Sequence, residues 1–261
     1  MINKEILSSQ GSLPHSPDVL KKMIQEQPYA GQDGIRLIFL PPRMTLDNAL
    51  DFCYVYRQIR DNRYETVLII EPDRAGDDET SKIPILPGQM VGTELGSLDA
   101  DDKLRDDLCD EEDDFFIRRH TDFSHLGFFD HVTMLQLVTG NFKVLGMQLT
   151  EESPPIVNEL VFVLNEILSA KNSLVVFCCE LPARQAVSFE QLAAAIREGN
   201  NTRMLNLIYS GESHINGAGI FLAGFQYARF REREIRFRPL FEDNPEANMI
   251  SGYAGFPDHS S

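Results

Sequence analysis

Apolar residues in this chain are grouped into short runs, separated by longer segments with helical periodicity. The first such unit starts with the run Ile35–Leu40, which stops at Pro41-Pro42-Arg43. A helical pattern extends from Thr45 to Ile59, and a second apolar run, Thr66–Ile70, precedes Glu71-Pro72-Asp73-Arg74. Two such runs joined by a helix predict parallel strands in a buried sheet. Ligands of such sheets bind beyond the carboxyl ends of the strands, so both terminal segments are candidate site positions.

The same alternation returns in the second half of the chain. Strands are expected at Phe142–Leu149 and Ser173–Cys179. Between them, Pro154–Leu168 predicts a helix with two prolines in its first turn, where a missing N–H costs nothing. Ser188 and Gln191 predict a capping box at the start of another helix, which extends to residue 197.

Three segments complete the pattern. Thr202–Tyr209 is expected to be helical, and the glycine-rich run Gly217–Phe225 predicts a helix that a neighbouring element can approach closely. The tail Tyr227–Phe241 alternates in polarity and predicts a solvated edge strand. Docking of its arginines against an acidic segment is the alternative interpretation.

The chain begins with a segment, residues 1–33, that contains several Pro, Gly, Ser and Gln residues. This composition predicts an irregular segment with one short helix over Asp18–Gln25. The total of 261 residues suits one large α/β domain or two small ones.

Composition narrows the range of partners. The formal net charge of −16 would repel phosphate backbones and anionic lipids, which argues against nucleic acid and membrane surfaces as partners. No apolar run approaches the roughly 20 residues needed to span a bilayer, so a cytoplasmic protein is expected. The four cysteines lack the two-residue spacing of zinc or redox motifs, and buried thiols are favoured over reactive or metal-binding ones.

Two polar segments contain residue types that bind metal ions in other proteins. Ten of the sixteen residues in Asp99–Asp114 are acidic, but the calcium-loop glycine is missing, which favours a solvated face with a short helix over Asp101–Cys109. His120, His125 and His131 lie close in sequence, as transition-metal ligands can. Their spacing would place them on different faces of a helix, so a scattered loop cluster is favoured.

Several short motifs, taken in order, carry a resemblance to a known family. They are Thr93-x-Leu95-Gly96-x-Leu98 followed by Asp101, Asp130-His131, Ser188-Phe189, Ile215-Asn216-Gly217 with Ile220, and Ser251-Gly252-Tyr253-Ala254-Gly255. From about Gly34 to its end the chain resembles the Memo family, the AmmeMemoRadiSam system protein B type. That family is related in fold to the class III extradiol ring-cleavage dioxygenases. The resemblance implies a single α/β domain over 34–261, with a mixed, mostly parallel central sheet and helices on both faces.

The resemblance also implies a metal site whose ligands have been replaced. Where the family has Pro-His-Ala-Gly this chain has Pro41-Pro42-Arg43-Met44, and Pro-Ser-His-His corresponds to Pro72-Asp73-Arg74-Ala75. The family's Ser-Ser-Asp and following His correspond to Cys178-Cys179-Glu180 and Ala183, and a family Cys corresponds to Asn216. Only His131, with Glu180 as a longer acid, keeps the family's polar character. Proline and alanine offer no donor atom, and an arginine opposes a nearby cation.

The resulting hypothesis is a Memo-like pseudoenzyme that acts as a binding or structural protein without a cofactor. Its partner would be an unknown protein, or a small anionic ligand or peptide held by convergent arginines. The candidate cleft consists of Pro42, Arg43, Glu71, Asp73, Arg74, His131, Glu180, Arg184 and Asn216. Internal pairing of these arginines with the acidic residues is slightly favoured over ligand binding. The alternative function is a metal-dependent oxygenase or hydrolase using Asp73, His131 and Glu180; no Gly-x-Ser-x-Gly elbow supports a serine hydrolase.

Overall fold

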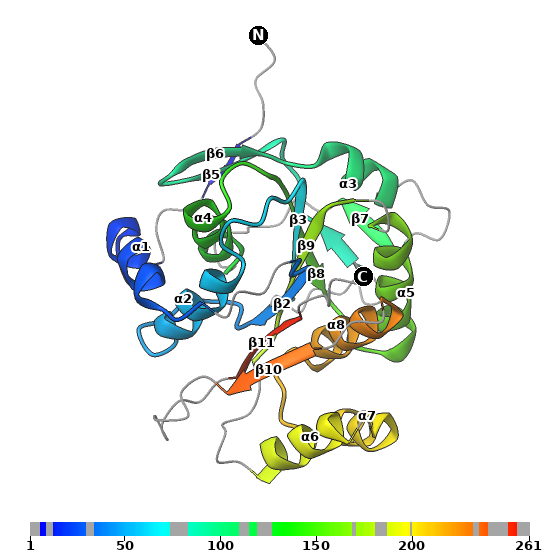
Figure 1. The fold of residues 1–261 in the computed structure, drawn as a ribbon. Helices are drawn as coiled ribbons and strands as arrows, with labels where there is room; N and C mark the ends of the chain where they lie inside the picture. The colour runs from blue at the N-terminus through cyan, green and yellow to red at the C-terminus, as the bar shows by residue number, and fades with distance from the viewer. Residues whose placement is uncertain are drawn as a thin grey trace, which may run out of the picture.

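An eight-stranded sheet forms the centre of the protein (Figure 1). The computed structural model describes residues 6–8, 13–29, 34–73, 83–109, 115–118, 127–168, 171–180, 187–198, 200–231, 235–239 and 250–254. The strand order is β10-β11-β2-β9-β3-β8-β4-β7. Its four middle strands run parallel: β2 (Leu37–Leu40), β9 (Ser173–Cys178), β3 (Thr66–Pro72) and β8 (Lys143–Leu149).

Short strands extend the sheet on both sides. Antiparallel β11 (Ile250–Ala254) adjoins β2, and β10 (Ile235–Pro239) forms the edge beyond it. On the other side β4 (Ile83–Ile85) is antiparallel to β8, and β7 (Phe116–Arg118) forms the edge. A second sheet of three strands has the order β1 (Ile6–Ser8), β5 (Met90–Thr93) and β6 (Gly96–Asp99).

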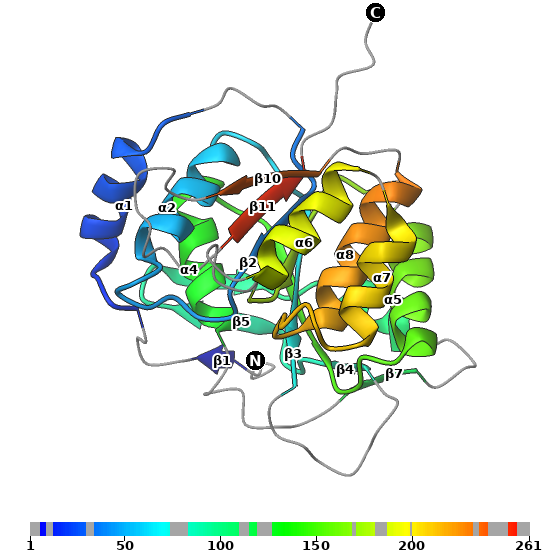
Figure 2. The same ribbon diagram turned by 90° about the horizontal axis from the view of Figure 1, so that it is seen from below.

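Helices cover both faces of the large sheet (Figures 1 and 2). On one face lie α1 (Pro17–Glu26), α2 (Ala49–Gln58) and α4 (Phe128–Val138). On the other face lie α5 (Pro154–Ile167) and α8 (Ala218–Phe230), with α6 (Val187–Arg197) and α7 (Asn201–Tyr209) beside them. The predicted α/β fold with a mixed, mostly parallel sheet between two helical layers is confirmed.

Strand residues alternate between two hydrophobic cores, one on each face. In β3, Val67 and Ile69 belong to the core beneath α1, α2 and α4, whereas Leu68 and Ile70 belong to the core beneath α5 and α8. Both faces are therefore buried, which explains why the sequence of this strand is a continuous apolar run. On α8, a Cβ at Gly224 would lie 2.5 Å from the Phe39 ring, so the predicted close helix packing is also present.

Several expected boundaries were wrong. The segment at 1–33 contains the expected helix, α1, but Ile6–Ser8 also forms a strand paired with β5, and its alternating exposure gave no apolar run to reveal it. Helix α8 continues through Tyr227 to Phe230, so the edge strand begins only at Ile235. Ser188 lies inside α6, which starts at Val187, and therefore does not cap it.

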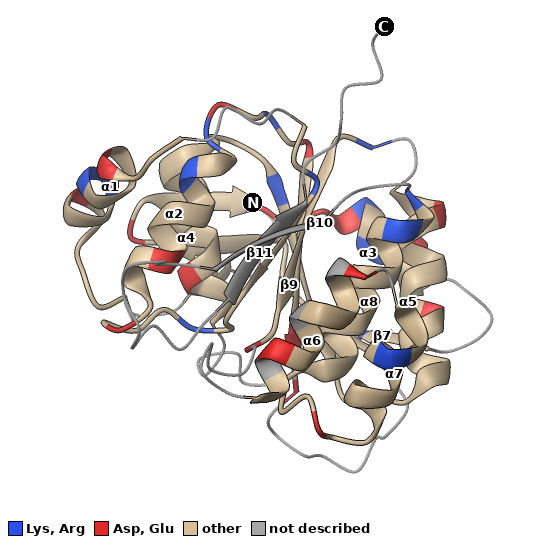
Figure 3. Ribbon diagram, turned by 60° about the horizontal axis from the view of Figure 1, so that its bottom comes forward, with Lys and Arg blue, Asp and Glu red and all other residues tan. Residues whose placement is uncertain are grey.

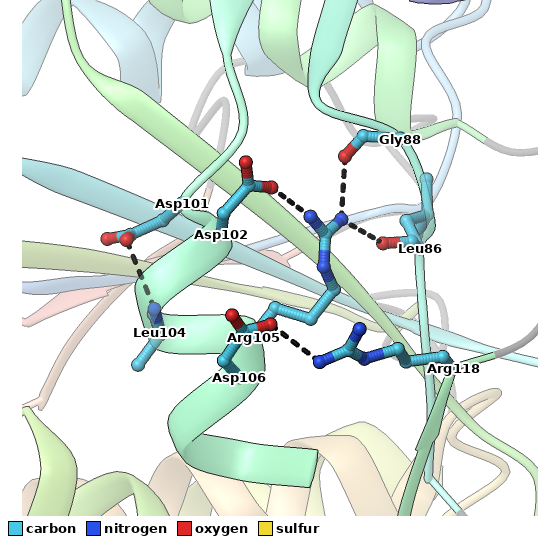
Figure 4. Close-up of polar contacts among 8 residues, drawn as sticks. All are labelled: Leu86, Gly88, Asp101, Asp102, Leu104, Arg105, Asp106 and Arg118. Atoms are coloured by element: carbon cyan, nitrogen blue, oxygen red, sulfur yellow. Dashed lines mark hydrogen bonds and ion pairs between the residues drawn. The ribbon is translucent and has the colours of Figure 1, made fainter. Parts of the chain in front are cut away.

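The acidic segment forms the expected helix, α3 (Asp102–Cys109), but one of its basic residues is buried. Arg105 is 7% exposed and donates hydrogen bonds to the carbonyls of Leu86 and Gly88, at 3.2 and 2.6 Å (Figure 4). Its guanidinium also pairs with Asp102. This arginine therefore anchors the helix to the connection that follows β4, while Leu104 and Leu108 face the core.

Charged positions lie mostly on helices and connections rather than on the middle strands (Figure 3). Among the described residues, no helix has the length and apolar character required to cross a membrane.

Candidate functional site

Two polar side chains lie side by side at the carboxyl ends of the middle strands. The alternation of β3 directs Glu71 to the same face as Ile69, and that of β9 directs Cys178 to the same face as Val176. Both therefore point toward α2 and α4. Glu71 is 2% exposed and Cys178 is fully buried.

His131 of α4 and Tyr56 of α2 meet these strand residues from the helical layer. Both are fully buried. The Tyr56 hydroxyl lies 2.7 Å from His131 Nδ1, and the other ring nitrogen, Nε2, lies 3.0 Å from the carbonyl oxygen of Pro41 and 3.4 Å from Cys178 Sγ. The Phe52 ring stacks on the imidazole, with 5.1 Å between centroids. We refer to Tyr56, Glu71, His131 and Cys178 as the His131 cluster.

These contacts determine the protonation of the imidazole. A carbonyl oxygen can only accept, so Nε2 of His131 donates to Pro41 and Nδ1 accepts a hydrogen bond from the Tyr56 hydroxyl. Burial lowers the pKa of His131 to about 4, with the backbone contacts to Pro41 and Pro42 acting in the opposite direction. The ring is therefore neutral near pH 7.

The thiol and the phenol of the cluster are harder to ionise than in water. Burial raises the pKa of Cys178 well above its ordinary value, and the charge of Glu71 raises it further. Burial likewise raises the pKa of Tyr56, with smaller effects from Cys178, Asp130 and Glu71. The thiol and the phenol are therefore protonated at neutral pH, and neither is a ready nucleophile or base.

Helix α4 positions the connection between β2 and α2 over this cluster. Gly127 precedes α4, and a Cβ at this position would lie only 1.4 Å from the carbonyl oxygen of Pro42. Three residues further on, Asp130 Oδ2 accepts a hydrogen bond of 3.1 Å from the backbone N–H of Met44. Asn48 then closes the turn by donating to the Arg43 carbonyl, at 2.9 Å.

The cluster contains a potential donor set for a metal ion. One ligand atom each from Glu71, His131 and Cys178 lies within 4.8 Å of the other two. Oxygen, imidazole nitrogen and thiolate sulfur are the donors that zinc accepts in proteins.

The structure brings only part of the predicted cleft together. Glu71 and His131 belong to the cluster, and Pro42 is buried beside it. Arg43 and Asp73 are half-buried, and Glu180 donates and accepts backbone hydrogen bonds with Asn216, whose side-chain amide also donates to the Glu180 carboxylate at 2.8 Å. Arg74 and Arg184 lie outside the described residues.

The histidine segment differs from the expected loop. His131 lies within helix α4 and is fully buried; His120 and His125 lie outside the described residues. Asp73 and Glu180, which the alternative metal set joined to His131, are not members of the donor group that the described residues form.

Sequence reasoning missed Tyr56 and Cys178. Cys178 could have been linked to Glu71, because both end buried parallel strands and both belong to the same alternating face. Nothing in the sequence distinguishes Tyr56 from the other apolar positions of its helix, because it follows the same helical periodicity as residues that only fill the core.

No protein-family model matches the chain, and no curated protein matches it either.

Proposed function

We propose that this chain is a Memo-like protein without catalytic activity, in which the family's metal site has been replaced and which acts by binding a ligand or partner. The observation that carries the proposal is the burial of the His131 cluster. His131 and Cys178 have no exposed surface and Glu71 has 2%. A catalytic metal keeps an open coordination position that a substrate can reach, and a closed donor set does not provide one.

Residues that correspond to the family's ligands also argue against catalysis. Pro42 has no donor side chain, and Arg43 brings a fixed positive charge to the same strand end. The residues there that water can reach are Arg43, Asp73, Glu180 and Asn216. This polar rim suits recognition of a small polar ligand rather than activation of dioxygen.

A small carboxylate or phosphate is the proposed ligand class. Within the described part of the chain, the buried Nε of Arg43 has no hydrogen-bond partner. The N–H groups of a guanidinium can donate two parallel hydrogen bonds to a carboxylate or a phosphate. Arg43 is therefore the residue expected to bind the anion.

Calorimetric titration of the full chain with inorganic phosphate, acetate and a short peptide with a free carboxyl terminus tests this ligand class. Arg43→Gln should weaken the binding of at least one anion by about tenfold. Arg203→Gln is the matched control, because Arg203 is a partly exposed arginine on α7 and its loss changes the net charge equally. Equal weakening by both variants would point to nonspecific charge attraction.

The absence of catalysis is tested separately. Protein supplied with Fe(II) and a panel of catechols should consume no more dioxygen than the same mixture without protein. Consumption that depends on the protein would instead support the second candidate, a metal-dependent oxygenase.

A further inference from the structure

We infer that Glu71, His131 and Cys178 form a closed, structural binding site for one divalent transition-metal ion, with zinc as the best fit. The site lies between the sheet and helices α2 and α4, and it uses a different residue set from the one that the family resemblance implies. It does not depend on the proposed function, since a buried structural ion requires neither a substrate nor an anionic ligand.

The spacing of the donors is that of a metal site. Zinc–sulfur and zinc–nitrogen distances of about 2.3 and 2.1 Å at a tetrahedral angle place the two ligand atoms about 3.6 Å apart. Cys178 Sγ and His131 Nε2 are 3.4 Å apart, and the Glu71 ligand atom lies within 4.8 Å of both. Only small side-chain shifts would bring all three onto one ion.

The imidazole is already held in the orientation that a metal requires. Metal-bound histidines use the second ring nitrogen for a hydrogen bond that fixes the ring. Here Tyr56 Oη lies 2.7 Å from Nδ1 and can accept as well as donate, while Phe52 stacks on the ring. Nε2 can therefore bind the ion while Nδ1–H donates to Tyr56.

The charges also balance. A divalent ion bound to one thiolate, one carboxylate and one neutral imidazole forms a group with no net charge, which a buried site tolerates. Binding displaces the thiol proton of Cys178 to solvent, and the imidazole exchanges its Nε2 proton for one at Nδ1. The Pro41 carbonyl, 3.0 Å from Nε2, then loses its hydrogen-bond donor, and its oxygen becomes available as the fourth ligand.

Metal content and cobalt spectroscopy test the site. The full chain, purified without chelators and then saturated with Zn²⁺, should retain about one equivalent after desalting and should melt at a higher temperature than chelator-treated protein. Co²⁺ in place of zinc should give a thiolate-to-metal charge-transfer band. Retention below about a tenth of an equivalent by folded wild-type protein would overturn the inference.

The chain contains a matched control for the thiolate. Cys178 and Cys179 are adjacent and both buried, but Cys179 belongs to the core on the opposite face of the sheet. Cys178→Ala should abolish the cobalt band, whereas Cys179→Ala and Cys53→Ala should retain it. Loss of the band in Cys179→Ala with retention in Cys178→Ala would refute the assignment.

Two further variants keep the test decisive if Cys178→Ala does not fold. Glu71→Gln preserves side-chain volume and should weaken zinc binding at least tenfold, because an amide is a poor substitute for a carboxylate ligand. Tyr56→Phe should weaken it by about tenfold through the orientation of His131. Unchanged affinity in both variants would show that the ion binds elsewhere. Metal binding together with catechol-dependent oxygen consumption would overturn the proposed function but leave this site intact.

Discussion

At the scale of single residues, burial separates His131 from every other histidine that the structure describes. His15 and His214 are not among the buried residues, whereas His131 is enclosed by Tyr56, Phe52 and the Pro41 carbonyl. Its ring is held neutral near pH 7 chiefly because burial removes the water that would stabilise an imidazolium charge.

Two buried groups make opposite contributions to the pH dependence of stability. Burial lowers the pKa of His131 to about 4 from 6.5, so the unfolded chain takes up its proton first and stability is lost as pH falls from 6.5 to 4. Burial raises the pKa of Asp51 to about 7 from 3.8, so the folded chain keeps its proton longer and stability is lost as pH rises from 3.8 to 7.

Single substitutions should reveal each contribution. Between about pH 5 and 7, Asp51→Asn should gain roughly 2 kcal/mol of unfolding free energy relative to wild type. His131→Gln should lose roughly 2 kcal/mol relative to wild type as pH rises over the same range. Urea denaturation of chelator-treated protein at several pH values measures both contributions. Curves for both variants that remain parallel to wild type would show that neither group titrates differently on folding.

At the scale of elements, α4 and the β2–α2 connection behave as one unit. Gly127, which precedes α4, approaches Pro42, and two residues of the first turn, Asp130 and His131, contact Met44 and Pro41. These contacts hold the β2–α2 connection in place beside the His131 cluster.

Gly127→Ala should destabilise the protein by about 3 kcal/mol. The added methyl group would lie 1.4 Å from the Pro42 carbonyl oxygen, so α4 or the connection must move. Gly92→Ala is a suitable control, because its Cβ would meet nothing closer than 3.4 Å. Thermal and urea denaturation compare the two, and a Gly127→Ala cost as small as the control would contradict the close approach.

Helix α3 offers a second comparison, between two arginines in Figure 4. Arg105→Met should cost about 3 kcal/mol, because the buried Leu86 and Gly88 carbonyls lose charged donors. Arg118→Met should cost less than about 1 kcal/mol, because its pair with Asp106 is exposed. Both substitutions remove one positive charge, so equal effects would indicate that net charge rather than burial is responsible.

The sequence was most informative where elements are buried on both faces. β3 and β9 each contain a continuous apolar run, β8 has a largely apolar one, and α2, α5 and α7 keep their expected positions within a few residues. Short edge elements such as β1 carry too few buried side chains to form a pattern. The His131 cluster joins α2, β3, α4 and β9, and its convergence depends on strand order and register that no local pattern encodes.

At the scale of the whole molecule, charge works against compactness. A formal charge of −16 on 261 residues produces self-repulsion that is greatest in the folded state, where the charges are closest. Among the described residues, the middle strands of the sheet carry few charged positions, and most of the others lie on helices and connections (Figure 3).

The protein should therefore become more stable as salt is added at low concentration. Raising sodium chloride from about 0.01 to 0.15 M shortens the screening length from about 30 to 8 Å, and the melting temperature should rise by a few degrees. Sucrose at equal osmolality is the uncharged control. A melting temperature that does not change with salt would mean that nearby positive charges already offset the repulsion between the acidic residues.

The order of strands in the sheet has a consequence for synthesis on the ribosome. β2 lies between β9 and β11, and its partner in β9 follows it by roughly 140 residues. At 5 to 20 residues per second, the apolar β2 segment waits roughly 7 to 28 s after emerging before that partner exists. The nascent chain therefore lacks the β9 partner of this strand during about half of translation, and a chaperone that covers residues 35–40 in that interval would protect an unpaired apolar strand.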